Sequence, residues 1–250
     1  MRKNDFRLGA DPSFSYGIAH RGLHDETRTE NGLNAFENAI DHGFAFELDI
    51  HLTRDGKLVV CHDSDLKRVT GKEGILEDLT LAEIEEGYRL LDGEKIPTFE
   101  EVLSLWKEQI GMVVELKVYR KNYKALAKAA KAALSVVKDK RKVLLISFDP
   151  RALFPFRKSG YLRQLLVCEK RKDVFFFRRF FEGADLEQCL PQHKNVRHYC
   201  KGHYVNFWTI ETPEELSRVL PYADTVTFQK MDPALVRQAF EKKYGPYPGR

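Results

Sequence analysis

Short apolar runs alternate with amphipathic segments along nearly the whole chain. The runs end in polar or charged residues, which is typical of buried strands, and nine can be distinguished: 16–20, 46–52, 58–60, 112–118, 142–148, 162–168, 185–190, 203–210 and 224–228. Between most of them, apolar residues recur at the three- and four-residue spacing of helices that bury one face. Strands and helices that alternate through short connections predict a parallel β/α architecture.

The predicted helices carry recognisable start signals. Thr80 and Thr98 each precede a helical pattern with a glutamate three residues later, which is the capping-box arrangement. Asn31 is the expected cap of a helix over 30–42, with a glycine at its end. Residues 123–137 are rich in alanine and lysine and predict a further helix.

Nine strand candidates fit an eight-stranded barrel with one strand to spare. We predict a TIM (β/α)8 barrel that forms a single domain over 1–250, with an N-terminal extension at 1–14 and a C-terminal tail at 245–250. The weakest candidate is 185–190, and one of the nine is expected to lie outside the barrel. A doubly wound open sheet is the alternative, but no glycine-rich phosphate motif follows the first strand.

Residues 173–183 form an aromatic segment between two strand candidates. With helical spacing, two arginines lie opposite four phenylalanines: Phe176, Phe177, Phe180 and Phe181. We expect these phenylalanines to be buried against the barrel, because four exposed phenyl rings would promote association. A surface that contacts lipid is the alternative.

The bulk composition describes an ordinary globular protein. Of the 250 residues, 43% are hydrophobic and 31% are charged, and the net charge of +4 is too small and too dispersed to indicate nucleic-acid binding. The four cysteines lie far apart without a CxxC pair, so we interpret them as reduced thiols. No apolar run has the length of a signal peptide or of a membrane span, which requires ~20 residues. We therefore expect a cytoplasmic protein without a transmembrane segment.

Two acids on one strand provide the first chemical signal. Glu47 and Asp49 are two residues apart, so both carboxylates point to one face of the strand while their apolar neighbours point to the other. Such carboxylates repel unless a proton or a cation lies between them, and oxygen ligands suit a hard divalent ion. After a turn, the 58–60 run places His62 in the same neighbourhood.

Further polar residues fall at or near the ends of other strand candidates. His20 and Arg21 follow the first, and Glu115 and Lys117 lie on one face of the fourth. In a barrel the C-terminal strand ends gather at one mouth. Singly, each residue has a structural explanation, such as a satisfied loop histidine or a polar strand edge. Together, carboxylates for a cation, cationic groups for phosphate oxygens and two imidazoles for acid and base suit phosphoryl chemistry.

The series of motifs resembles the glycerophosphodiester phosphodiesterase family. The motifs follow one another over most of the chain: His20-Arg21-Gly22, Thr29-Glu30-Asn31-Gly32, Glu47-Leu48-Asp49, Thr53-Arg54-Asp55-Gly56, Val59-Val60-Cys61-His62-Asp63, Ile96-Pro97-Thr98, Glu115-Leu116-Lys117, Ser147-Phe148 and Trp208-Thr209-Ile210. Such a series in one order is a specific signal.

The resemblance implies a TIM-barrel enzyme that hydrolyses small glycerophosphodiesters to glycerol 3-phosphate and an alcohol. It implies one divalent cation, Mg²⁺ or Ca²⁺, and the following roles: metal binding by Glu47, Asp49 and Glu115, acid/base catalysis by His20 and His62, phosphate binding by Arg21 and Lys117, and a substrate pocket at Trp208. It also implies attack by a glycerol hydroxyl through a cyclic phosphate, while direct attack by water stays open.

The sequence departs from the family pattern outside the metal and histidine motifs. Thr29 and Gly32 replace proline and threonine. Glu211 stands where asparagine is common, and Gln229 with Lys230 replaces a threonine and an aspartate. We expect these changes to affect the alcohol that is recognised rather than the chemistry. A lysophospholipase D activity and a barrel that binds phosphate ligands without catalysis are the alternatives.

Overall fold

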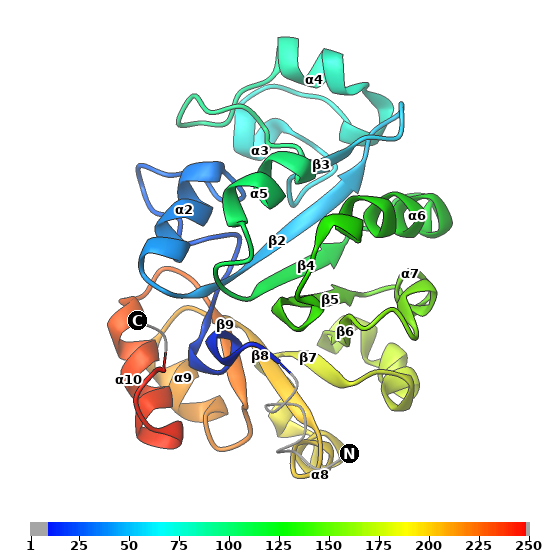
Figure 1. Ribbon diagram of the computed structural model, residues 1–250. Coiled ribbons are helices and arrows are strands. Elements are labelled where there is room, and N and C mark those ends of the chain that lie inside the picture. The colour runs from blue at the N-terminus through cyan, green and yellow to red at the C-terminus, as the bar shows by residue number, and fades with distance from the viewer. Residues whose placement is uncertain (1–9, 249–250) are drawn as a thin grey trace.

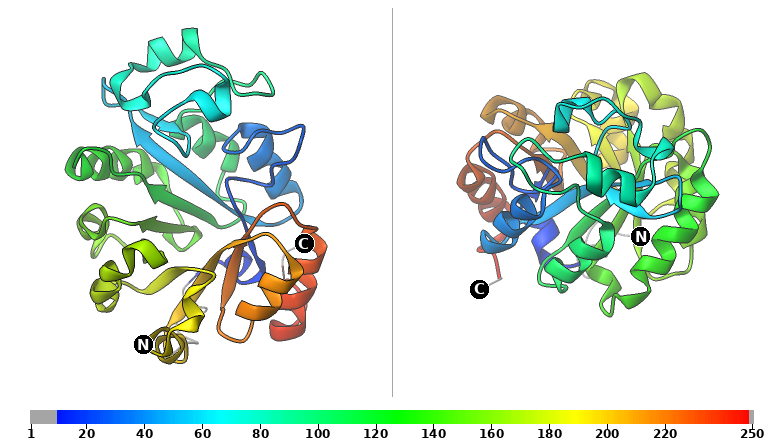
Figure 2. Two further views of the ribbon diagram at one scale, coloured as in Figure 1. Left: turned by 180° about the vertical axis from the view of Figure 1, so that it is seen from behind. Right: turned by 90° about the horizontal axis from the view of Figure 1, so that it is seen from above.

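Eight parallel strands close into a barrel with helices on its outside (Figure 1; Figure 2). The computed structural model describes residues 10–248. Around the barrel, the strands are β1 (Ile18–Ala19), β2 (Ala45–Leu52), β4 (Met112–Leu116), β5 (Val143–Ser147), β6 (Leu162–Val167), β7 (Gly183–Glu187), β8 (Tyr204–Ile210) and β9 (Thr225–Phe228). The two-residue β1 closes the barrel because it pairs with both β2 and β9. The predicted TIM barrel is confirmed.

The ninth strand, β3 (Leu58–Val60), lies outside the barrel and pairs antiparallel with the end of β2. The weak candidate at 185–190 is instead the barrel strand β7, two residues earlier than expected. Its apolar pattern is poor because Asp185 lies inside the barrel, where it accepts a hydrogen bond of 2.7 Å from Asn206. The polar residue in the barrel interior interrupts the apolar pattern by which β7 would be recognised in the sequence.

Nine α-helices lie within residues 10–248: α2 (Leu33–Asp41), α3 (Lys67–Thr70), α4 (Leu81–Gly87), α5 (Phe99–Trp106), α6 (Tyr123–Ala133), α7 (Pro150–Leu153), α8 (Lys194–Cys200), α9 (Pro213–Val219) and α10 (Pro233–Tyr244). The capping boxes predicted at Thr80 and Thr98 are both formed. The cap predicted at Asn31 is wrong, because α2 begins after Gly32 without a side-chain cap. The Asn31 amide is used elsewhere, as described below.

Apolar residues fill both sides of the barrel wall. Outside, the strands pack on the helices in one continuous core. Inside, a smaller cluster contains Phe14, which is 1% exposed and comes from the 3-10 turn Pro12–Tyr16. Phe14 lies against Gly111, just before β4 begins, so it closes the N-terminal end of the barrel. Polar groups are therefore left to the opposite end. Residues 1–9 and 249–250 of the predicted extension and tail lie outside the described residues.

The aromatic segment is a 3-10 helix over Glu169–Phe180, with a kink at Arg171. The expected burial is wrong for three of its phenylalanines, since Phe176, Phe177 and Phe180 are 65%, 36% and 44% exposed. Phe181 is buried as expected. The reason is the helix period, because three residues per turn direct a different set of side chains to the barrel than 3.6 residues per turn.

No disulfide joins the four cysteines. Within residues 10–248, the helices are too short or too polar for any of them to cross a membrane.

Candidate active site

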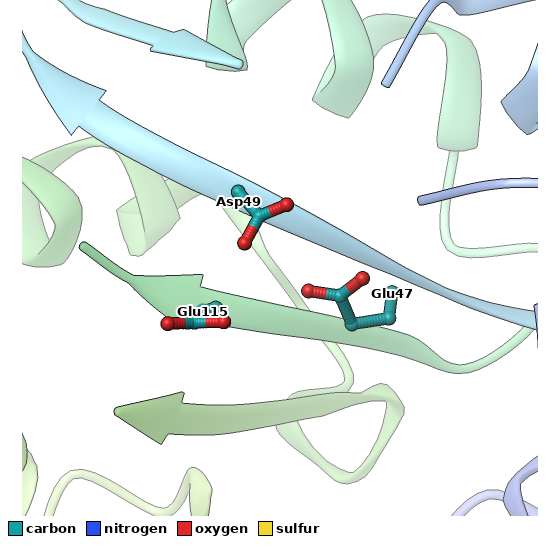
Figure 3. A group of neighbouring side chains, drawn as sticks. All are labelled: Glu47, Asp49 and Glu115. Carbon is teal, nitrogen blue, oxygen red and sulfur yellow. The ribbon is translucent and has the colours of Figure 1, made fainter. Parts of the chain in front are cut away.

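Three buried carboxylates face one another inside the barrel (Figure 3). β2 carries Glu47 and Asp49, and β4 carries Glu115, which lies opposite Asp49 in the strand register. Each acid offers an oxygen within 4.8 Å of the others, and the three residues are 3%, 1% and 7% exposed. The two-residue spacing on β2 therefore does place both acids in the interior.

The pKa values of the three acids are shifted in different directions. Burial and the charges of Asp49 and Glu115 raise the pKa of Glu47 well above its usual range. Burial also raises the pKa of Glu115 to about 7. Burial acts in the same direction on Asp49, but Lys117, His62 and Arg21 outweigh it and hold the pKa of Asp49 below its usual value. Without a cation, the cluster therefore retains protons that an exposed cluster would lose.

Lys117 lies directly against two of the acids. Its Nζ is 3.1 Å from Glu115 Oε1 and 3.4 Å from Asp49 Oδ1. Burial opposes the charge of this ammonium, yet Glu115 and Asp49 prevail and raise the pKa of Lys117. The side chain is thus a fixed cation at the cluster.

Arg21 provides the second cation. Its backbone N–H donates to Glu47 Oε2 at 3.0 Å, and its guanidinium approaches Asp49 at 3.5 Å. Arg21 has a φ of +55°, and Gly22 follows with a φ of +82°. A Cβ at Gly22 would lie 2.8 Å from the backbone of Ala35, so glycine is needed to bring this loop against α2.

Asn31 makes two hydrogen bonds to Asp49, one to its carboxylate and one to its backbone. Its Nδ2 donates to Asp49 Oδ2 at 2.9 Å, and its Oδ1 accepts from the Asp49 backbone N–H at 3.3 Å. The residue is 2% exposed. It fixes the rotamer of Asp49 and leaves the Oδ1 atom of that carboxylate directed at Lys117.

His20 is held by residues at the far end of the chain. Its Nδ1 lies 2.6 Å from Gln229 Oε1, and its Nε2 lies 3.9 Å from Glu47 Oε2. The Nε2 of Gln229 in turn donates to Glu211, which Lys230 also approaches at 3.3 Å. Burial, together with the charge of Arg21, lowers the pKa of His20 to about 3.

His62 has a carboxylate partner instead. Its Nδ1 lies 2.6 Å from Asp63 Oδ1, and Arg68 binds the other oxygen of Asp63 at 2.5 Å. Arg68 continues to Glu30, which also binds Arg21 at 2.7 Å. Burial lowers the pKa of His62. An unbroken series of ion pairs therefore joins the two histidine loops.

A buried pair supports the loop of His62 from behind. His51 is 2% exposed, with Nδ1 at 2.6 Å from Glu77 and Nε2 at 3.1 Å from the His62 carbonyl oxygen. Glu77 belongs to the segment between β3 and α4, which stands beyond the end of β2 (Figure 1). The contact between His51 and Glu77 thereby links the segment between β3 and α4 to the barrel strand β2.

A cavity of about 500 Å³ opens beside the acids and is lined by residues that include His62, Glu115, Lys117 and Phe148. Trp208 packs edge-on against Phe148, with ring centroids 5.7 Å apart. The indole Nε1 of Trp208 is buried without a hydrogen-bond partner. Trp208 thus contacts one residue of the cavity wall, and the substrate pocket at Trp208 stays a prediction.

The structure thus brings the predicted metal, histidine and phosphate residues together, and Trp208 lies one contact away. Sequence reasoning gave Asn31 the role of a helix cap and Gln229 a part in recognising the alcohol, and it did not single out His51; none of the three was expected to position a site residue. For His51 a signal existed, because it continues the two-residue alternation that begins with Glu47 and Asp49. For Gln229, 209 residues from His20, no local signal exists.

A barrel whose interior gathers three acids, two cations and two histidines defines an enzyme of the phosphate-ester type. The comparisons with known proteins make this specific. The family model described as the glycerophosphoryl diester phosphodiesterase family matches residues 20–225, and the chain belongs to that family. It is an enzyme that hydrolyses glycerophosphodiesters, and the predicted activity class is confirmed.

Individual relatives agree with this assignment. The glycerophosphodiester phosphodiesterase of Caldanaerobacter subterraneus is 30% identical over 224 residues, which are 81% of this chain and 88% of the relative. A Bacillus altitudinis enzyme of the same name is 34% identical over 56% of this chain and 61% of the relative. The crystal structure of the Thermotoga maritima glycerophosphodiester phosphodiesterase has a TM-score of 0.71 at 27% identity and covers 89% of this chain and 96% of that chain.

Proposed function

We propose that the chain hydrolyses glycerophosphodiesters to glycerol 3-phosphate and an alcohol with one divalent cation, and with His20 and His62 as base and acid. The observation that carries the proposal is the set of three buried carboxylates, with His20 Nε2 3.9 Å from Glu47 and the charge of Asp49 acting on His62. Without a bound cation, three buried carboxylates would destabilise the folded chain, because like charges repel one another in a buried site.

The donor set fits Mg²⁺ or Ca²⁺. Glu47, Asp49 and Glu115 would hold the ion, since all three present carboxylate oxygens, which hard divalent cations prefer. The raised pKa values of Glu47 and Glu115 support this fit, because a bound cation would replace the protons that these groups otherwise keep. When bound, the ion supplies positive charge that stabilises the negative charge developing on the phosphoryl oxygens.

Arg21 and Lys117 bind the phosphate in this proposal. Both are charged at the cluster, and Lys117 also lines the cavity beside it. An ammonium and a guanidinium on the same group can hold its oxygens in a fixed orientation for attack.

His20 suits the role of general base. The carbonyl oxygen of Gln229 can only accept, so the proton of His20 lies on Nδ1 and the Nε2 lone pair is available. Because the pKa of His20 is lowered to about 3, the ring is neutral at ordinary pH. Nε2 therefore takes the proton of the attacking hydroxyl, from the substrate glycerol or from water.

His62 suits the role of general acid. Asp63 accepts a hydrogen bond from Nδ1–H and favours the imidazolium form, which opposes the lowering of the His62 pKa by burial. The protonated ring then donates from Nε2 to the oxygen of the departing alcohol. The different partners of the two histidines, an amide and a carboxylate, support this division of roles.

Parallel assays test the proposal. Purified chain is incubated with glycerophosphocholine, glycerophosphoethanolamine and a lysophospholipid, and glycerol 3-phosphate and the free alcohol are measured. We expect both products from the two diesters, in a reaction that EDTA stops. Absence of glycerol 3-phosphate with every diester would overturn the proposed products. A faster reaction with the lysophospholipid would favour the lysophospholipase D alternative.

A further inference from the structure

The surface outside the active site has one unusual region, on the 3-10 helix Glu169–Phe180. Three of its phenyl rings are exposed, at Phe176, Phe177 and Phe180, and Phe154 packs on Phe180 with centroids 6.1 Å apart while remaining 39% exposed. We call these four residues the phenylalanine face. They account for four of the seven large hydrophobic side chains exposed in the described part of the chain.

Cations lie beside the phenylalanine face. Arg179 lies over the rings of Phe176 and Phe180, with its guanidinium carbon 5.6 and 5.1 Å from their centroids. Beside Phe176 runs a groove that also contains Arg178, Arg179, Lys194, Lys201 and three histidines. Among the residues lining this groove, none is acidic.

This combination of groups fits one kind of partner. Exposed phenyl rings favour the boundary between headgroups and acyl chains, and arginine and lysine are attracted to anionic headgroups. A protein partner would satisfy the rings, but a groove with no acid and several cations needs dense negative charge opposite it. We propose that the phenylalanine face and its cationic groove dock the enzyme on an anionic membrane surface.

The segment lies close to the active site, so docking would bring the enzyme near a source of its substrate. This part of the inference rests on the proposed function. Arg171, at the start of the same 3-10 helix, lines the cavity beside the acid cluster, whereas the exposed phenylalanines do not. The face is thus adjacent to the site without forming an acyl pocket in it. A glycerophosphodiester is what remains of a phospholipid after hydrolysis of both acyl esters, so docking would place the enzyme where such deacylation supplies its substrate.

The test is vesicle flotation of the purified full-length chain. One set of vesicles is phosphatidylcholine alone, and the other is an equal mixture of phosphatidylcholine and phosphatidylglycerol. We expect the chain to float with the anionic vesicles and to be largely released at about 1 M salt, where the screening length is only ~3 Å. Binding needs no turnover, so this result does not depend on whether the proposed function is correct.

Two double variants test the exposed phenyl rings and the cationic groove separately. Phe176→Ser with Phe180→Ser removes exposed rings, and Arg179→Glu with Lys194→Glu reverses charge. We expect each pair to weaken vesicle binding by about tenfold or more, since each cation near the surface contributes roughly fivefold. Turnover of a soluble glycerophosphodiester and the circular dichroism spectrum should stay unchanged, which shows that the variants fold.

Matched controls lie elsewhere on the surface. Leu235→Ser on α10 removes an exposed apolar side chain, and Lys128→Glu on α6 reverses an exposed charge. Both should bind vesicles as the unmodified chain does. The proposal is overturned if the unmodified chain floats with neither vesicle, or if the paired variants float as well as the controls. Self-association that the phenylalanine variants abolish, without vesicle binding, would assign the face to a second copy of the chain instead.

Discussion

The Oε1 atom of Gln229 lies 2.6 Å from Nδ1 of His20, and Glu211 accepts a hydrogen bond from the same amide. A carboxylate can only accept, so it turns the amide nitrogen of Gln229 towards itself and the amide oxygen towards His20. Glu211 therefore determines, through one residue, which ring nitrogen of His20 carries the proton.

Replacing this amide by an acid should alter the pH dependence of the reaction. In Gln229→Glu, a carboxylate would favour the imidazolium form and raise the pKa of His20 from about 3. A base must be unprotonated, so the acid limb of the kcat/KM profile should move to higher pH. The exposed Gln238→Glu serves as control and should leave the profile unchanged. An unmoved acid limb would remove His20 from the role of base.

The histidines themselves should be indispensable. We expect His20→Ala and His62→Ala each to lower kcat by about 10² or more, because general acid/base catalysis contributes roughly 10² to 10⁴. The double variant should lose less than the product of the two effects, since the residues act in one step. His42→Ala, on the exposed end of α2, is the matched control. A variant that keeps near-normal kcat would reduce its histidine to a structural role.

Metal binding should strengthen as the pH rises through neutrality. Glu115 has a pKa of about 7, and the pKa of Glu47 is also raised, so the cation must displace protons at lower pH. Calorimetric titration with Mg²⁺ or Ca²⁺ at several pH values should give an affinity that falls below pH 7. Glu47→Gln with Asp49→Asn should abolish binding. Undiminished turnover after exhaustive EDTA treatment contradicts the metal site altogether.

The same pKa shift has a consequence for stability with the opposite sign. A carboxyl whose folded pKa is raised binds its proton more tightly in the folded state, so its contribution to the free energy of unfolding is present at low pH and is lost as pH rises. For Glu115 this window runs from the ordinary pKa of 4.5 to about 7. Urea denaturation of the metal-free chain should show the loss across that window, and saturating cation should reduce it.

Asn31 should matter for the metal although it is no proposed ligand. Asn31→Ala frees the Asp49 carboxylate to rotate, and loss of such a supporting hydrogen bond typically lowers metal affinity by about 10- to 100-fold. The exposed Asn195→Ala is the control and should bind the cation normally. Equal affinities in the two variants would mean that Asn31 only links its loop to β2.

Two phenylalanines of one short helix should differ in their effect on stability. Phe175 is 7% exposed and packs on Tyr199, so Phe175→Ala should lower the free energy of unfolding by about 3 to 5 kcal/mol. Phe180 is 44% exposed, so Phe180→Ala should cost about 1 kcal/mol or less. Urea denaturation of both variants measures the difference. Similar losses would place Phe180 in the core.

What could be predicted from the sequence was local or periodic. The alternation on β2 identified Glu47 and Asp49, and the capping boxes identified the starts of α4 and α5, because each pattern spans a few neighbouring residues. The order of motifs along the chain then supplied the family.

What failed depends on contacts across the fold. Asparagine is a residue type that often caps helices, and the local sequence shows no more than this at Asn31. Its hydrogen bond to Asp49, 18 residues later, forms only when the chain is folded. The exposed phenylalanines were misplaced because the sequence does not distinguish a 3-10 period from an α-helical one. The cytoplasmic location and the domain boundaries remain predictions.

The hydrogen bond between Glu211 and Gln229 also constrains how the chain can diverge. A mutation at either position alone breaks this hydrogen bond and removes the constraint that keeps the proton of His20 on Nδ1. Selection should therefore accept changes at 211 and 229 together far more often than separately. Among descendants of a common ancestor, these two positions should be inherited as a pair, even though 17 residues separate them in the gene product.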